Sequence, residues 1–366
     1  MYHINEPFKN LPHLTLDGDL STKKVLLLTH TDMDGSGAAI VLKAALPEDV
    51  TVDVQHCSNS TMSKDILKAV TTYDVAKKYD LIIACDISCL LIDAERINTS
   101  NFKDKFVLLD HHDTAKFLNK FDWACVHPSI ICDEYRNNAY GEKVSLGHSS
   151  GTSLMYDYLR YYDFISDEIT VNPNCNAKTL RYLTHMITLF DTWDFREVFG
   201  EADITPYELN QVFTGMGSDI FEKKIYERCM QADNGNAPKE NIFDDLVKTI
   251  LRIEQNKVQA HTDTVRKRLV NEHIVLDNTT YSMVYCYTDK YLTEIFDMML
   301  EDYPDSDLYA INYGTGVSVR SRKPDIHVGN LLKSIGGGGH AGAGGVKIQS
   351  SEQRKYIEAA LHGTIQ

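Results

Sequence analysis

The sequence predicts a two-domain α/β protein with an N-terminal domain built on a parallel sheet, a long helical linker and a smaller C-terminal α/β domain. Two observations predict this fold class. Between residue 23 and about residue 130, short and nearly continuous apolar runs alternate with amphipathic segments, which is typical of parallel strands buried on both faces. A charge-rich helical stretch from residue 241 to about residue 271 then precedes a second series of strands and helices. We place an N-terminal extension at 1–22, the first domain at 23–232, the linker at 233–272 and the second domain at 273–366.

The elements of each domain follow from its hydrophobic pattern. Three apolar runs predict strands of the first sheet, at Val25–Leu28, Leu81–Cys85 and Phe106–Leu109. Apolar residues at helical spacing predict the helices of the first domain, at Gly37–Ala45, Ser63–Lys78, Ser153–Tyr162 and Ala177–Phe190. The second domain is expected to contain strands at Tyr281–Tyr287, Leu308–Ile311 and Gly316–Arg320, and helices at Leu292–Leu300 and Val328–Ser334. Gly336–Gly345 is expected to form a glycine-rich loop that closes this domain.

Composition limits the classes of partner. A formal net charge of −15 argues against a protein that binds long nucleic acid through a broad basic surface. An anionic substrate stays compatible with this charge, because bound metal ions reverse the local sign. The eight cysteines form no Cys-x-x-Cys pair, which indicates reduced thiols in a cytoplasm. No stretch approaches about 18 consecutive apolar residues, so we expect a soluble, cytoplasmic protein without membrane contact.

Each of the three apolar runs ends in polar residues. These residues share side chains that bind metals or transfer protons, and they are His30, Asp32, Asp34, Asp86, Asp110, His111 and His112. In parallel α/β sheets, ligands gather at the carboxyl ends of the strands. The sequence therefore predicts that all seven side chains lie at one edge of the first sheet.

This set of side chains is suited to a pair of divalent cations. Carboxylate oxygens and imidazole nitrogens bind such ions, and a carboxylate is able to bridge two of them. Because the set contains no cysteine, it suits manganese or magnesium better than structural zinc. A pair of these ions activates water for in-line displacement at phosphorus.

The second domain offers groups that bind an anion. Gly336 to Gly339 precede His340, and backbone N–H groups of such a glycine run approach an anion closely. Arg320 and His340 supply charged donors. We therefore interpret this domain as a clamp on the part of a phosphorylated substrate that does not react.

In this order, Asp32-x-Asp34-Gly35, Asp86, Asp110-His111-His112, Asp191 and the Gly336–His340 loop resemble the DHH phosphoesterases that carry a DHH-associated C-terminal domain. Within that superfamily the His-x-Asp-x-Asp-Gly entry and the Asp-Thr-Trp at 191–193 are most similar to bacterial nanoRNases of the NrnB type. The resemblance covers nearly the whole chain from residue 23. In many relatives the first histidine lies three residues from the first aspartate, whereas one residue separates His30 from Asp32.

The resemblance implies a role for each matching residue. It implies one manganese ion held by His30, Asp32 and Asp86, and a second held by Asp34, Asp86, His111 and Asp191, with Asp86 bridging. Asp110 would orient its neighbours, and His112 would face the scissile phosphate as a hydrogen-bond donor or acid. The terminal phosphate or sugar of the substrate would be bound by Arg320, Gly337, Gly338, Gly339 and His340.

Three further motifs compete with this interpretation. Asp32-Met33-Asp34-Gly35-Ser36 is similar to the nucleophile segment of haloacid-dehalogenase phosphatases, but that hypothesis leaves Asp110-His111-His112 unexplained. Residues 147–151 fit the serine-hydrolase pattern Gly-x-Ser-x-Gly, although Ser149 or Ser150 is better explained as a helix N-cap. Gly337-x-Gly339-x-x-Gly342 imitates a dinucleotide fingerprint but lies too near the end of the chain for a complete βαβ unit.

The sequence thus predicts a cytoplasmic, manganese-dependent phosphodiesterase that releases mononucleotides from very short oligonucleotides. Its expected partners are short oligonucleotides or dinucleotides, without long duplex and without membrane, and a homodimer is left open. The alternatives are a RecJ-like single-strand exonuclease, a 3′-phosphoadenosine 5′-phosphate phosphatase and a non-catalytic nucleotide sensor.

Overall fold

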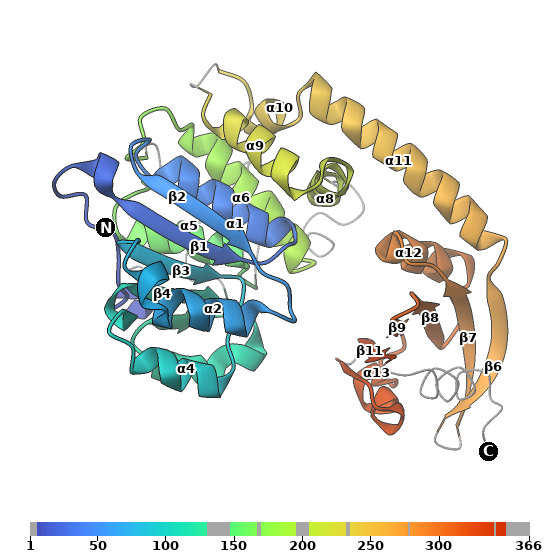
Figure 1. Cartoon of the computed structure of the whole chain (residues 1–366). Helices are drawn as coiled ribbons and strands as arrows, with labels where there is room; N and C mark the ends of the chain where they lie inside the picture. The colour runs from blue at the N-terminus through green and yellow to red at the C-terminus, as the bar shows by residue number, and fades with distance from the viewer. Residues whose placement is uncertain are drawn as a thin grey trace. The chain divides into compact units, whose positions relative to one another are not determined.

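The computed structural model describes residues 6–129, 147–166, 170–194, 205–231, 235–276, 279–339 and 342–348. The chain forms two compact units, Met1–Glu254 and Gln255–Gln366, which are described in turn. The boundary between them lies inside helix α11 (Asp245–Arg266), within the predicted linker. Each unit contains its own sheet (Figure 1), so the predicted α/β fold class is confirmed. No helix in the described ranges is long and apolar enough to cross a lipid bilayer.

The first unit is built on a five-stranded parallel sheet with the order β2-β1-β3-β4-β5. Its strands are β1 (Lys24–Thr29), β2 (Thr51–His56), β3 (Leu81–Cys85), β4 (Phe106–Asp110) and β5 (Ala124–Val126). The register places Leu27 between Val54 on one side and Ile83 on the other. Strands β1, β3 and β4 occupy the centre and are buried on both faces, as their continuous apolar runs predict.

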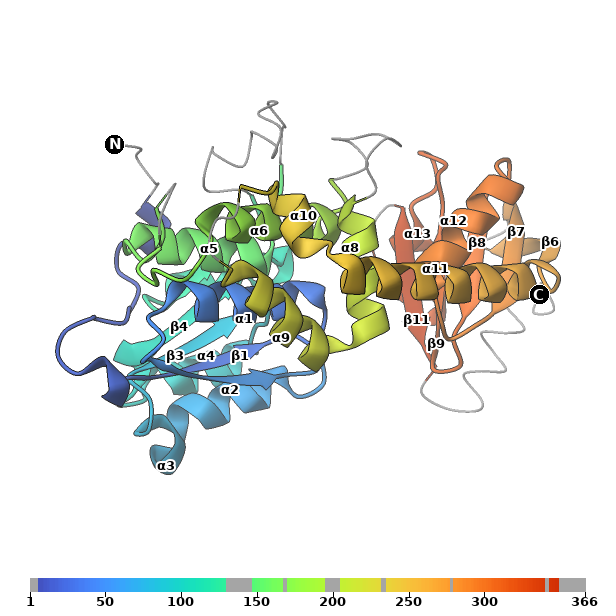
Figure 2. The same cartoon turned by 90° about the horizontal axis from the view of Figure 1, so that it is seen from above.

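Helices cover both faces of this sheet and form two separate cores (Figure 1, Figure 2). The larger core contains α1 (Met33–Ala45), α5 (Gly151–Tyr161), α6 (Ala177–Asp191), α8 (Thr205–Met216) and α9 (Ser218–Cys229). The smaller core contains α2 (Met62–Thr71) and α4 (Leu91–Asn98). The Ser150 side chain accepts from the Ser153 N–H, and the Ser153 hydroxyl accepts from the Ser150 N–H in return. The predicted N-cap role of Ser150 is therefore confirmed, and this capping box fixes where α5 begins.

Residues 6–22 pack into the first unit. Phe8, Leu11 and Leu14 are buried in its larger core. The Tyr162 hydroxyl donates to the backbone carbonyls of Phe8 and Leu11, at 2.6 and 2.7 Å. The sequence predicts that this segment is an extension, because it contains prolines and acidic residues. In the structure it contributes apolar side chains to the core.

The predicted helix over residues 241–271 is wrong at both ends. A short helix, α10 (Pro238–Ile242), precedes α11, which is one continuous helix (Figure 2). Helix α11 ends at Arg266, and Val270 already begins strand β6 (Val270–Leu276). The sequence does not show where the helix ends and β6 begins, because β6 is partly exposed and carries polar residues like those of the helix before it.

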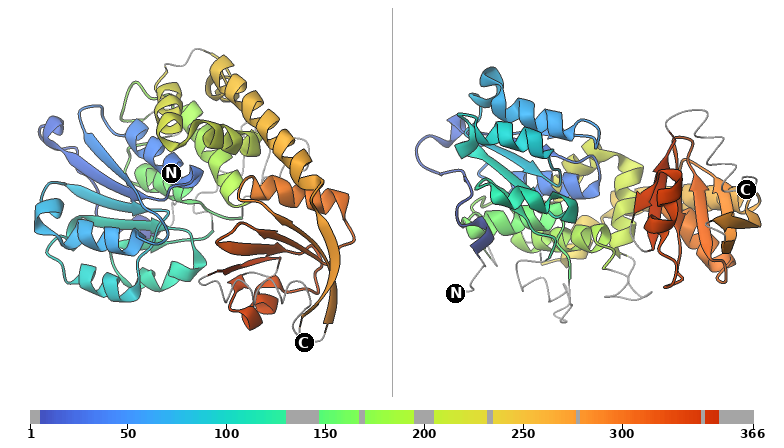
Figure 3. Two further views of the ribbon diagram at one scale, coloured as in Figure 1. Left: turned by 45° about the vertical axis from the view of Figure 1, so that its right-hand side comes forward. Right: turned by 90° about the horizontal axis from the view of Figure 1, so that it is seen from below.

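The second unit is a six-stranded sheet with the order β10-β11-β9-β8-β7-β6. Besides β6, its strands are β7 (Thr279–Tyr287), β8 (Leu308–Asn312), β9 (Gly316–Arg320), β10 (Gly338–Gly339) and β11 (Ala343–Lys347). Only β7 and β8 pair in parallel; the other described pairs are antiparallel. Helix α12 (Leu292–Asp302) packs on one face and α13 (Val328–Leu331) on the other (Figure 3).

The predicted glycine-rich loop at Gly336–Gly345 is largely a β-hairpin. Gly338 pairs with Gly345, and Gly339 pairs with Gly344. Before the hairpin, Gly336 adopts a left-handed φ of 79°. Such a run resembles a loop in sequence because glycine carries no hydrophobic pattern, although its backbone groups form ordinary strand pairs.

Candidate metal centre

The carboxyl ends of β1, β3 and β4 bring acids and imidazoles together, as the parallel sheet predicts. Among the described residues, three groups each place one donor atom per residue within 4.8 Å of the others. These groups are His30, Asp32 and Asp86; then Asp34, His111 and Asp191; and finally Asp86, Asp110, His111 and His112. Every candidate metal ligand named from the sequence therefore belongs to one of the groups, and Asp86 and His111 belong to two.

The first group is set by the entry into helix α1. Asp32 is the N-cap of α1, and its Oδ1 accepts from the N–H of Gly35 at 3.0 Å. Its Oδ2 lies 2.6 Å from Nδ1 of His30, and that nitrogen lies 4.0 Å from Oδ2 of Asp86. The hydrogen bond with Asp32 raises the pKa of His30 in spite of partial burial.

Asp86 connects the groups, because it belongs to two of them and lies beside His111 of the remaining one. It follows β3, has a left-handed φ of 60° and is buried. Its Oδ1 lies 3.2 Å from Nε2 of His111. Burial raises the pKa of Asp86 well above its usual range, and the neighbouring carboxylates, first among them Asp34, raise it further. The side chain is thus placed where its negative charge is costly unless a cation is present.

The second group depends on two helices. Asp34, in the first turn of α1, is buried and accepts from the N–H groups of Gly151 and Thr152, at 2.5 and 2.9 Å. These donors are the first residues of α5. Asp191 is the last residue of α6, and its Oδ2 lies 3.6 Å from Nε2 of His111. Burial and the charges of the nearby acids raise the pKa of Asp191 well above its usual range, whereas burial lowers the pKa of His111.

Asp110 holds the adjacent histidines. Its fully buried carboxylate accepts from the backbone N–H of His111 at 2.8 Å, and its Oδ1 lies 2.7 Å from Nδ1 of His112. The hydrogen bond to Asp110 raises the pKa of His112. With a side chain that is 54% exposed, His112 presents an oriented imidazole at the opening of the cluster.

These residues fit a divalent metal centre. In the described part of the chain, the Oδ2 atoms of Asp86, Asp110 and Asp191 are buried and lack a hydrogen-bond partner. Buried carboxylate oxygens without donors are expensive, and divalent cations would satisfy them. The donors are carboxylate oxygens and imidazole nitrogens, the ligands that manganese accepts and, for the oxygens, magnesium prefers.

The second unit contains the residues predicted to bind the rest of the substrate. Arg320 ends β9 and pairs with Ala343 of β11, the strand that also pairs with Gly338 and Gly339. The Arg320 guanidinium lies 4.4 Å from the ring centroid of Phe296. Arg320 and the glycine hairpin thus belong to neighbouring strands of one sheet. His340 lies outside the described residues.

The sequence matches two domain families of known proteins. Residues 24–183 match the DHH family, N-terminal domain, and residues 278–366 match the DHHA1 domain. The chain therefore carries a DHH-family N-terminal domain followed by a DHHA1 domain. The resemblance inferred from its motifs is thereby confirmed.

The chain is similar to several known proteins. The oligoribonuclease NrnB of Bacillus subtilis (strain 168) is 25% identical over 338 residues, which make up 92% of this chain and 75% of NrnB. The pGpG-specific phosphodiesterase PggH of Vibrio cholerae superposes with a TM-score of 0.50 at 15% identity, over 92% of this chain and 97% of PggH. RecJ of Thermus thermophilus, in complex with Mn²⁺, superposes with a TM-score of 0.51 at 13% identity, over 100% of this chain and 55% of RecJ. At such identities the two structures show a shared fold.

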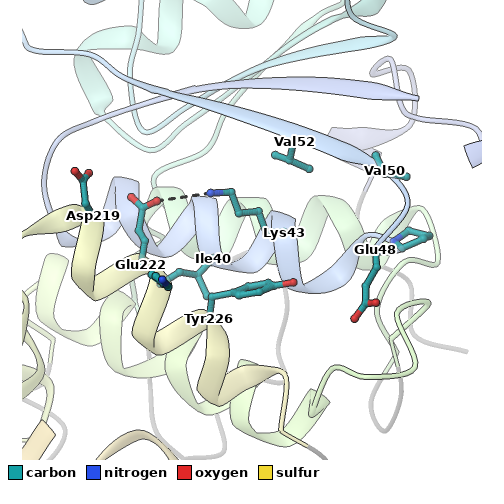
Figure 4. Close-up of a pocket in the computed structure, with 10 residues that line it drawn as sticks. Ile40, Lys43, Glu48, Val50, Val52, Asp219, Glu222 and Tyr226 are labelled. Carbon is teal, nitrogen blue, oxygen red and sulfur yellow. Dashed lines mark ion pairs between the residues drawn. The ribbon is translucent and has the colours of Figure 1, made fainter. Parts of the chain in front are cut away.

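His56 contacts a residue of the candidate metal centre. The sequence does not indicate this contact, since an isolated histidine is more often a core or surface residue. It ends β2, and its Nδ1 lies 2.7 Å from the backbone carbonyl oxygen of His30. Its Nε2 lies 2.6 Å from Oε1 of Glu222 on α9. Glu222 and Lys43 face each other 3.9 Å apart in a groove of about 450 Å³ between α1, β2 and α9 (Figure 4). His56 therefore fixes the backbone of a candidate metal ligand against a helix from elsewhere in the unit.

Replacing His56 with alanine should weaken Mn²⁺ binding. The His30 carbonyl would lose its hydrogen bond, and the segment from His30 to Asp32 would be held less firmly. Loss of such a supporting contact costs on the order of tenfold in metal affinity. Titration calorimetry with Mn²⁺ measures this, with Lys223→Ala in the same groove as the matched control. Equal affinity in His56→Ala and the wild type would exclude the supporting role.

Proposed function

We propose that this DHH-family protein is a phosphodiesterase that uses two Mn²⁺ ions, or Mg²⁺ in their place, to hydrolyse short oligonucleotides and release mononucleotides. One observation carries the proposal. The groups around His30 and His111 lie next to each other, and Asp86 lies beside both histidines. His30, Asp32 and Asp86 would hold one ion. Asp34, Asp86, His111 and Asp191 would hold the other, so that Asp86 would contribute to both.

The surrounding residues prepare the site for phosphoryl chemistry. Two divalent ions supply Lewis acidity and an activated water when they are bound. Asp110 fixes the imidazole of His112, and the raised pKa of His112 keeps it protonated to higher pH than a free histidine. A protonated His112 at the opening of the cluster donates a hydrogen bond to a phosphate oxygen or a proton to the leaving group. The helix α5 N–H groups hold Asp34 in the orientation that this site requires.

Two observations support short oligonucleotides as the substrate class. NrnB is an oligoribonuclease and PggH is a pGpG-specific phosphodiesterase by name. The net charge of −15 disfavours a long nucleic-acid track. Arg320, Gly337–Gly339 and His340 would bind the phosphate or sugar that does not react.

A cytoplasmic setting is supported by the seven described cysteines, which form no disulfide.

Incubation with Mn²⁺ and end-labelled RNAs of about two to 25 nucleotides tests the proposal. We expect the shortest substrates to be cleaved fastest, because a single anion clamp contacts one terminal group and additional nucleotides add no binding energy that accelerates the reaction. Preference for long single strands would replace the proposal with a RecJ-like exonuclease. Phosphate release from 3′-phosphoadenosine 5′-phosphate, with oligomers intact, would indicate a nucleotide phosphatase. Tight dinucleotide binding without any product would indicate a sensor.

A further inference from the structure

A histidine outside the proposed metal ligands is held by a buried carboxylate. Nδ1 of His148 lies 3.0 Å from Oδ1 of Asp194, and the backbone N–H of His148 donates to Oδ2 of Asp194 at 3.3 Å. The Asp194 side chain is 8% exposed, whereas that of His148 is 65% exposed. Both carboxylate oxygens of Asp194 thus contact His148. The other ring nitrogen of His148, Nε2, is available to a further partner.

The segment that carries His148 is joined to the candidate metal centre on both sides. His148 pairs with Ser129, which follows β5, and the backbone N–H of His127 donates to the carbonyl of Asp110 at 2.8 Å. Three residues after His148, the N–H of Gly151 donates to Asp34. His148 therefore lies at the same edge of the sheet as the proposed ligands.

Asp194 reaches His148 through an unfavourable backbone turn. Asp191 ends α6, and three residues later Asp194 is directed back towards His148. The turn requires a φ of 62° at Trp193. Glycine normally occupies a left-handed position after a helix, and a bulky side chain there is disfavoured. Strain of this kind is typical of functional sites. Of the four positive-φ residues other than glycine in the described ranges, Asp86 and Trp193 both belong to this edge.

We propose that His148, oriented by Asp194, is a substrate-binding residue whose Nε2 contacts a phosphate or ribose oxygen of the nucleotide next to the scissile phosphate. This inference rests on the proposed hydrolysis of short oligonucleotides and adds a contact for them outside the metal ligands. A carboxylate that fixes one nitrogen of an imidazole sets the direction of the other. An oriented imidazole at this edge of the sheet is suited to selecting substrates with a second nucleotide.

Calorimetry of the full-length protein with the dinucleotide pApA tests the contact, with Ca²⁺ replacing Mn²⁺ so that binding is measured without turnover. We expect Kd for pApA to rise at least about tenfold in His148→Ala, a typical loss for one good hydrogen-bonding contact, and several-fold in Asp194→Asn. In Mn²⁺ assays the same variants should raise KM more than they lower kcat. Exposed His273, in β6 of the second unit, gives the matched control His273→Ala, which should match the wild type.

The outcomes separate this inference from the proposed function. A Kd for pApA that is the same in His148→Ala and the wild type overturns the contact. A parallel loss of Mn²⁺ affinity also overturns it, because the residue would then act on the structure of the centre. If the wild type binds pApA but does not cleave it with Mn²⁺, the proposed hydrolysis fails while the affinity difference still supports the His148 contact. If the wild type binds no pApA, both proposals fail.

Discussion

Asp86→Asn is expected to lose both metal ions and to reduce turnover at least about 10³-fold, since the contribution of metal ions to a phosphoryl-transfer transition state is several kcal/mol. Asparagine is the informative substitution because it tolerates the left-handed φ of 60° and keeps a hydrogen-bonding side chain. What it removes is the negative charge between the two donor groups. Mn²⁺ stoichiometry by calorimetry and initial rates on a dinucleotide measure the two effects.

Stability measurements make this prediction specific to the metal centre. Mn²⁺ should raise the melting temperature of the wild type and leave that of Asp86→Asn unchanged. Without metal, the variant should melt no lower than the wild type. A carboxyl group whose pKa is raised by folding destabilises the protein above its unfolded-state pKa, and asparagine removes that penalty. Exposed Asp163 has a φ of 63° and provides Asp163→Asn as a control with matched backbone. Two bound Mn²⁺ ions in Asp86→Asn would contradict the bridging role.

Gly151→Ala is expected to disrupt the same centre by steric contact alone. A Cβ at this position would lie 2.4 Å from Cβ of Asp86 and 2.9 Å from Oδ2 of Asp34. The N terminus of α5 would have to move away from both acids, and the hydrogen bond from the Gly151 N–H to Asp34 would lengthen. Overpacking of this kind costs about 1–3 kcal/mol of stability. Thermal unfolding and Mn²⁺ calorimetry would record a lower melting temperature and a weaker metal affinity.

Gly147→Ala is the matched control for this substitution. Gly147 lies four residues earlier in the same segment, and a Cβ there would meet no described atom within 4 Å. The control should bind Mn²⁺ like the wild type. If Gly151→Ala also retained wild-type metal affinity, the close approach of α5 to Asp34 and Asp86 would not be needed for the centre.

The sequence predicts most of this centre because one physical rule brings it together. Parallel strands end at one edge, so side chains that follow β1, β3 and β4 must meet, however far apart they lie in the chain. Asp191 ends a helix and follows no strand, so only the family resemblance could add it to the set. The metal roles of these residues stay predictions that the binding experiments above address, and the predicted domain limits stay predictions as well.

The contacts that the sequence did not predict join distant segments through only one or two hydrogen bonds. Nothing in the pattern around His56 indicates that Glu222 is its partner, and nothing around His148 indicates Asp194. Two of the strands that the sequence did not predict have a different explanation. Strands β2 and β6 lie at the edges of their sheets and alternate in exposure, so neither presents the continuous apolar run that identifies a central strand.

The edge position of β2 also affects how the protein behaves at high concentration. Along one side of this strand, the described residues provide no neighbouring strand, so its backbone groups are open to pairing with another chain. Exposed Asp53 lies in the middle of β2 and accepts a hydrogen bond from the Tyr79 hydroxyl at 2.9 Å. A charge at that position opposes strand-to-strand aggregation. Variants that make β2 uniformly apolar would therefore lose solubility while the candidate metal centre stayed intact.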